Sequence, residues 1–135
     1  MPIRSDFTGE WKVDLGASTL HGPTPKAIVV RIAHFEPDLR VDMTIVGADD
    51  KERVIAFAAR SSGGQVTNTV LGNEWISQSQ WVGRELLIES QVSQAGRRMH
   101  FRDYWSLSDD GRRLTMEHRD DDLAGQVTIL DRVPG

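Results

Sequence analysis

The chain has 135 residues, the size of one ordinary domain, and we expect a single domain over residues 1–135. It contains no cysteine, which excludes disulfide frameworks, thiolate metal sites and cysteine nucleophiles. The formal net charge of -4 opposes binding to the phosphates of nucleic acids, so we expect no nucleic-acid partner.

We find no membrane or export signal in the sequence. Residues 1–6 lack the apolar stretch of a secretory signal peptide, and no run approaches the roughly 18 apolar residues of a membrane span. We therefore expect a cytoplasmic protein with no membrane partner, either a monomer or a homodimer.

Apolar residues recur at every second position almost throughout, and glycine, proline, aspartate and asparagine separate the apolar runs. A period of two is typical of half-buried strands, and the separating residues are typical of tight turns. The pattern predicts an all-β fold, a single antiparallel up-and-down β-barrel of about 8–10 strands. The predicted strands cover residues 8–14, 26–34, 38–46, 52–60, 65–71, 74–81, 84–92, 97–107, 112–119 and 126–132.

The second and third predicted strands each place their apolar side chains on one face, because successive strand residues point to opposite sides. These side chains are expected to form an apolar wall of the barrel lumen that ends in a histidine. The residues are Ile28, Val30, Ile32 and His34 in one strand, and Leu39, Val41, Met43 and Ile45 in the next.

The predicted strand 74–81 can face the lumen in either of two ways. We favour the arrangement that turns tryptophan and serine inward, because it follows from carrying the alternation of the next strand across the turn at Val82 and Gly83. Small hydroxylic side chains there would leave space and offer hydrogen bonds to a ligand. The inward set is Trp75, Ser77, Ser79 and Trp81 in this arrangement, and Ile76, Gln78 and Gln80 in the alternative.

Two turn signals set the register of the C-terminal half. Asp110 and Gly111 form a strong two-residue hairpin signal, and Ala95 and Gly96 form a similar one. Both hairpins assign the same residues of the shared strand to the interior. The predicted inward pairs are Leu86 with Trp105, Ile88 with Asp103, Ser90 with Phe101, Trp105 with Met116, and Asp103 with His118.

Asp103 and His118 form the most informative pair, since a carboxylate directly opposite an imidazole can orient it. One interpretation is a general acid or base, and the other is an ion pair that only satisfies two polar groups. His34 can join them only if the barrel closes suitably. These three side chains lack diagnostic metal-ligand spacing, so we expect no metal.

Nucleotide cofactors are not supported, because residues 61–64 (SSGG) lack the lysine and the helix of a phosphate-binding loop. We expect no cofactor. The candidate ligand contacts are Trp75, Ser77, Ser79, Ile88, Ser90, Phe101, Trp105, Met116, Met43 and His34, of which the aromatic residues can stack on a flat ligand.

Residues 7–12 (FTGEWK) resemble the Gly-x-Trp first-strand signature of calycins, the lipocalin and fatty-acid-binding-protein barrels, and Arg132 resembles the basic residue over that tryptophan. Residues 11–14, 25–26 and 107–115 also look like a group of small bacterial lipocalin-like domains, mostly of unassigned function. The resemblance implies a barrel closed at the Trp11 end, with ligands entering at the other.

The resemblance also bears on the ligand. Fatty-acid binders hold a carboxylate with arginine and tyrosine in the last strand, whereas the corresponding stretch here, 126–132, reads QVTILDR. We therefore expect the lumen to bind a small, largely apolar, neutral molecule, with room for an aromatic one.

Two other functions stay open. An enzyme could use Asp103 and His118 for cofactor-independent isomerisation, cyclisation, elimination or addition. An interaction protein could instead use a patch on the outer barrel surface. The residues of that patch would be Arg102, Tyr104, Glu117 and Arg119.

Overall fold

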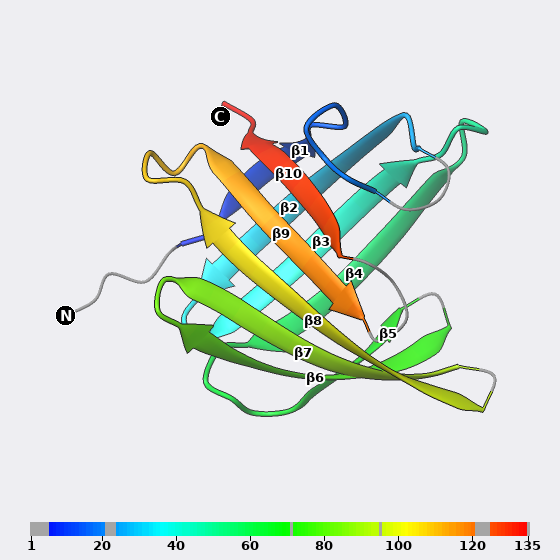
Figure 1. Cartoon of the computed structure of the whole chain (residues 1–135), viewed down its shortest axis with the longest axis vertical. Helices are drawn as coiled ribbons and strands as arrows, with labels where there is room; N and C mark the ends of the chain where they lie inside the picture. The colour runs from blue at the N-terminus through cyan, green and yellow to red at the C-terminus, as the bar shows by residue number, and fades with distance from the viewer. Residues whose placement is uncertain (1–5, 21–23, 71, 95, 121–124, 135) are drawn as a thin grey trace.

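The computed structural model describes residues 6–20, 24–70, 72–94, 96–120 and 125–134. Ten strands make up the regular structure of these residues, which confirms the all-β prediction (Figure 1). The described part of the chain contains no helix long and apolar enough to cross a membrane. The strands are β1 (Gly9–Val13), β2 (Ala27–Phe35), β3 (Asp38–Val46), β4 (Glu52–Arg60), β5 (Val66–Val70), β6 (Asn73–Val82), β7 (Glu85–Gln94), β8 (Arg97–Leu107), β9 (Arg113–Asp120) and β10 (Gln126–Arg132).

The strands form one sheet in the order β4-β3-β2-β1-β10-β9-β8-β7-β6-β5. Every hydrogen-bonded strand pair is antiparallel, and each joins strands adjacent in sequence except β1 with β10. That pair brings the first and last strands side by side (Figure 1). The sheet therefore curls into a nearly closed up-and-down barrel, as the sequence predicted.

The remaining seam of the barrel lies between the sheet edges β4 and β5. Asn68 of β5 crosses this seam with its side chain. Its Oδ1 accepts a hydrogen bond from the amide of Ala58 at 2.8 Å, and its Nδ2 donates to the Ala58 carbonyl at 2.8 Å. One carboxamide thus satisfies a backbone donor and acceptor that a neighbouring strand would otherwise pair.

The register of the C-terminal hairpins is the predicted one. Trp105 lies opposite Met116 and Asp103 opposite His118 across β8 and β9, and Asp103 also lies opposite Ile88 of β7. Trp105, Met116 and Ile88 are buried, which confirms that this face is the interior.

The structure resolves the two arrangements considered for β6. Ser77 and Ser79 are 6% and 2% exposed, whereas Gln78 and Gln80 between them are exposed. The tryptophan and serine face is therefore the inner one. Alternation continues across β7, where Ser90 is buried opposite Ser77.

Trp11 and Arg132 close one end of the barrel. Trp11 is fully buried, and the Arg132 guanidinium lies 4.3 Å from the centroid of its ring, a cation–π contact. Arg132 also donates to the carbonyls of Thr8 at 2.7 Å and Gly111 at 3.0 Å. This arginine therefore joins the start of β1, the β8–β9 turn and the end of β10.

Gly9 makes this close approach geometrically feasible. Its φ of +146° is one that side-chain-bearing residues rarely adopt, and an added Cβ would lie 2.5 Å from Nη1 of Arg132. We predict that Gly9→Ala lowers the free energy of unfolding by about 1–3 kcal/mol. Gly64→Ala, at a position with nothing within 4 Å of the added Cβ, should change it by less than about 0.5 kcal/mol.

Urea denaturation followed by tryptophan fluorescence measures both variants. Equal stability of Gly9→Ala and the parent chain would contradict the proposed role of Gly9 at the closed end.

Candidate functional site

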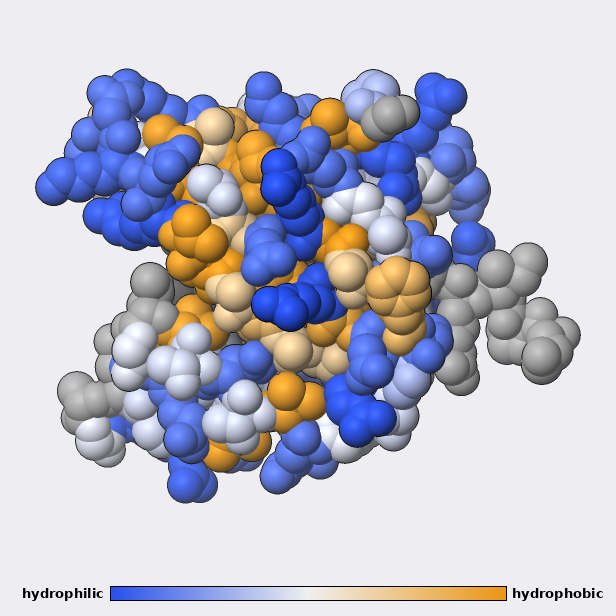
Figure 2. Space-filling model, turned by 180° about the vertical axis from the view of Figure 1, so that it is seen from behind, coloured by the Kyte–Doolittle hydropathy of each residue, from blue (hydrophilic) through white to orange (hydrophobic). Residues whose placement is uncertain are grey.

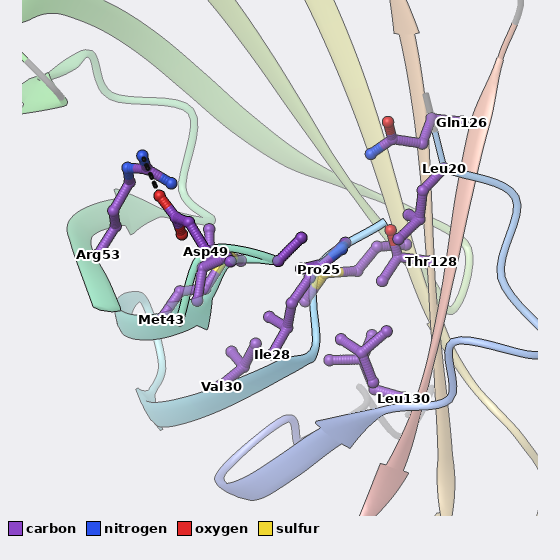
Figure 3. Close-up of a pocket in the computed structure, with 15 residues that line it drawn as sticks. Leu20, Pro25, Ile28, Val30, Met43, Asp49, Arg53, Gln126, Thr128 and Leu130 are labelled. Carbon is purple, nitrogen blue, oxygen red and sulfur yellow. Dashed lines mark ion pairs between the residues drawn. The ribbon is translucent and has the colours of Figure 1, made fainter. Parts of the chain in front are cut away.

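The described residues line a larger and a smaller cavity inside the barrel. The larger has a volume of about 560 Å³ and lies at the end that carries the β3–β4 hairpin and the start of β10. Ile28, Val30 and Leu130 project into it, and Asp49 and Arg53 form an ion pair at its edge, with 3.9 Å between Oδ2 and Nη2 (Figure 3). The large cavity is lined by Val13, Leu20, Pro25, Ile28, Val30, Met43, Ile45, Gly47, Ala48, Asp49, Arg53, Met116, Gln126, Thr128 and Leu130.

The smaller cavity has a volume of about 300 Å³ and lies beside the β4–β5 seam. It shares Met43 and Met116 with the large cavity, so these two side chains stand where the two spaces meet. The small cavity is lined by Met43, Ile55, Phe57, Ala58, Ala59, Asn68, Val70, Trp75, Ser77, Ile88, Ser90, Asp103, Trp105, Met116 and His118.

The barrel surface is hollowed at the end opposite Trp11 and Arg132. This hollow lies at the left of Figure 2, with hydrophobic side chains beside it. This end carries the β3–β4 and β7–β8 hairpins at the right of Figure 1. The end closed by Trp11 and Arg132 is instead packed with side chains, and Phe7 and Trp11 there are fully buried.

Asp103 and His118 meet within the small cavity. His118 Nδ1 lies 2.7 Å from Asp103 Oδ1, and the two side chains are 29% and 24% exposed. Because an ionised carboxylate only accepts hydrogen bonds, Nδ1 carries the hydrogen and Asp103 fixes the orientation of the ring.

Aromatic rings surround this pair. Phe101 stacks on Trp75, with 5.2 Å between ring centroids, and its ring is tilted against that of His118, with 5.0 Å between centroids. Trp105 and Phe57, which line the same cavity, meet edge to face with 6.2 Å between ring centroids. Such rings supply a large contact area for a flat or apolar ligand.

Seven of the ten candidate ligand contacts line the small cavity. They are Trp75, Ser77, Ile88, Ser90, Trp105, Met43 and Met116. Ser77 and Ser90 bond to each other through their hydroxyl oxygens, 2.9 Å apart. Phe101 lies behind the lining in the aromatic stack, and Ser79 is buried with its Oγ lacking a hydrogen-bond partner among the described residues.

The structure places His34 away from Asp103 and His118, at the closed end. Its Nδ1 accepts a hydrogen bond from the Phe7 amide at 3.2 Å, and its Nε2 lies 2.6 Å from Glu36 Oε1. Ser61 Oγ donates to the same carboxylate, 2.9 and 2.8 Å from its two oxygens. The His34 ring also stacks on Phe7, with 5.6 Å between centroids, so it contributes to the packing of this end.

Sequence reasoning missed the contribution of β4 and β5 to the site. The run 53–58 (RVIAFA) has apolar residues at both parities, so alternation alone could not show that Ile55 and Phe57 face inward. The pairing of Met43 with Ile55 across β3 and β4 would have identified them. Asn68 carried no signal, because its role depends on the closure of the barrel.

Metal ligation finds no support in the arrangement of the described residues. Nowhere in this part of the chain do three or more histidine, aspartate or glutamate side chains gather closely enough to hold an ion.

No known family model matches the chain, and no curated protein matches it. Solved structures with a similar fold include a protein described as "REP1-NXSQ fatty acid transporter", with a TM-score of 0.68 and 13% identity over 96% of this chain and 98% of that one. Another is secretory abundant heat soluble protein 4 from Ramazzottius varieornatus, with a TM-score of 0.69 and 10% identity over 99% and 100%. At these identities the likeness establishes the fold alone, an up-and-down β-barrel.

The closed end offers a pH-dependent test. Burial raises the pKa of Glu36, but hydrogen bonds from His34, Ser61 and Trp81 outweigh it and leave the pKa below its ordinary value of 4.5. A carboxyl group whose pKa is lowered by folding stabilises the folded state at pH values above its pKa in the unfolded chain. This stabilisation is lost as the pH falls through the folded-state pKa. Glu36→Gln should therefore destabilise the protein at neutral pH.

The stability that Glu36→Gln loses should become smaller as the pH falls below about 4.5. Urea denaturation at a series of pH values measures the free energy of unfolding of the variant and the parent chain. Glu10→Gln is the matched control, since Glu10 pairs with Arg31 at the surface, with 3.0 Å between Oε1 and Nε, and should cost less than about 1 kcal/mol. A pH-independent effect of Glu36→Gln would contradict the assignment.

Proposed function

We propose that this chain is a single binding domain that holds a small, largely apolar molecule in the barrel lumen. The observation that carries the proposal is the pair of mostly apolar cavities that meet at Met43 and Met116. Their volumes lie within the range of about 300–1,000 Å³ typical of ligand pockets.

The two methionines suit a shared lumen. Methionine is unbranched and flexible, so a change of rotamer at Met43 or Met116 would let one molecule extend through both cavities. The aromatic rings of the small cavity favour a ligand with a flat or aromatic part. The sparse polar lining of the large cavity favours a neutral body.

We do not propose a fatty acid as the ligand of this chain, although one structural neighbour is described as a fatty acid transporter. A fatty-acid carboxylate would need a cation from the last strand, but Arg132 there stacks over Trp11 and donates to Thr8. The residues of β10 that line the large cavity include Gln126 and Thr128, which are uncharged. Among the described residues of β10, neither an arginine nor a tyrosine therefore lines the large cavity, although the resemblance implies both for a fatty-acid ligand.

Blocking the lumen tests this function. A neutral dye whose fluorescence rises in apolar surroundings should bind the parent chain, and any retained molecule should appear in native mass spectrometry. Ile55→Trp fills the small cavity and Ile28→Trp the large one, so each should weaken dye binding by about tenfold or more.

Val54→Trp is the matched control, because Val54 adjoins Ile55 but is 65% exposed on the outer face. It should leave the affinity unchanged. If the parent chain bound no dye and retained no ligand, the binding function would be refuted.

One observation favours a second function, cofactor-independent acid/base catalysis. The hydrogen bond of 2.7 Å between His118 Nδ1 and Asp103 Oδ1 orients an imidazole inside a cavity. An imidazole held in this way can take a proton from a bound molecule, as isomerisation, cyclisation, elimination and addition all require.

Exchange of the α-protons of a small apolar ketone in heavy water, followed by NMR, reports such proton abstraction. We expect exchange faster than in buffer, and a loss of about 10²-fold or more in His118→Ala. His100→Ala is the control, since His100 lies beside Glu89, 3.6 Å away, on the outer face. An undiminished rate in His118→Ala would exclude His118 as the base.

A further inference from the structure

We propose that the polar end of the bound molecule is an amine, held in the small cavity against Asp103, with its apolar part extending past Met43 and Met116 into the large cavity. This inference rests on the proposed binding function and assigns the chemical class of its ligand. It amends the expectation of a neutral ligand that the sequence analysis reached.

The carboxylate of Asp103 has unused acceptor capacity. Its Oδ1 accepts from His118, while its Oδ2 has no hydrogen bond to any residue in the described part of the chain. An ionised carboxylate can accept several hydrogen bonds and donates none. The small cavity therefore offers an acceptor to a ligand that brings N–H groups.

The charges of the small cavity favour a cation. Asp103 and His118 are the ionisable side chains among its described lining residues, which include neither lysine nor arginine. An ammonium group beside Asp103 would make a charge-assisted hydrogen bond, which is stronger than one between neutral groups. A ligand carboxylate would instead face a like charge.

The aromatic side chains of the small cavity also favour a cationic ligand. Trp75, Trp105 and Phe57 line the same cavity as Asp103. An organic cation is attracted to the faces of such rings, most strongly where water is excluded. The cavity thus combines one carboxylate with several aromatic rings, a combination that suits an amine.

The large cavity offers no competing site of the same kind. Its two charged lining residues, Asp49 and Arg53, pair with each other at its edge, and the Arg53 side chain is 55% exposed. Ile28, Val30 and Leu130 form its apolar wall (Figure 3). An alkyl or aryl chain would be buried there while the amine remained beside Asp103.

Displacement of the neutral dye by three molecules of equal chain length tests the proposal: dodecylamine, dodecanol and dodecanoate, each below its micellar concentration. At neutral pH the amine is a cation and the acid an anion. We expect dodecylamine to bind about tenfold or more tightly than dodecanol, and dodecanoate to bind most weakly. Equal affinities, or tighter binding of dodecanoate, would overturn the amine assignment.

Asp103→Asn removes the charge but keeps an acceptor for His118. It should weaken the affinity for dodecylamine about tenfold and change the affinity for dodecanol by less than about twofold. Glu89→Gln, the same charge change on the outer face of β7, should leave both affinities unchanged. Dye binding without amine selectivity would reject the ligand class and leave the binding function standing, whereas absent dye binding would reject both.

Discussion

The alternation of side chains along antiparallel strands is the constraint on which the lumen depends. The register of β8 against β7 and β9 turns Asp103, His118 and Trp105 toward one another. A slip of one residue in either hairpin would turn the inward side chains of the shifted strand to the outer surface. The turn at Gly111, which has a φ of +71°, therefore helps to determine the lumen as well as the path of the chain.

The barrel contains two polar clusters that differ in how fully they are satisfied. At the closed end, the carboxylate of Glu36 receives hydrogen bonds from His34 and Ser61, and the cluster is packed against Phe7. In the small cavity, Asp103 Oδ1 bonds to His118, while Oδ2 has no hydrogen bond to a residue in the described part of the chain. Satisfied groups stabilise a fold, whereas an unused acceptor beside a cavity is suited to a ligand.

The sequence by itself determined the strands and the local pairing. All ten predicted strands lie within two residues of the observed ones, and the pairing of Asp103 with His118 followed from the Asp110-Gly111 turn. The physical reason is that periodicity and turn chemistry act over a few residues, so a hairpin carries its own register. The contact of Arg132 with Trp11 followed from the resemblance of the first strand to calycins.

Only the tertiary structure decided which strands face one another across the lumen. It placed Met43 and Met116 in the lining of the same two cavities, turned Ile55 and Phe57 of β4 inward, and placed His34 at the closed end, away from His118. It also assigned Asn68 to the seam. These contacts join residues far apart in the sequence, and they depend on the curvature and closure of the whole sheet, which no local pattern specifies.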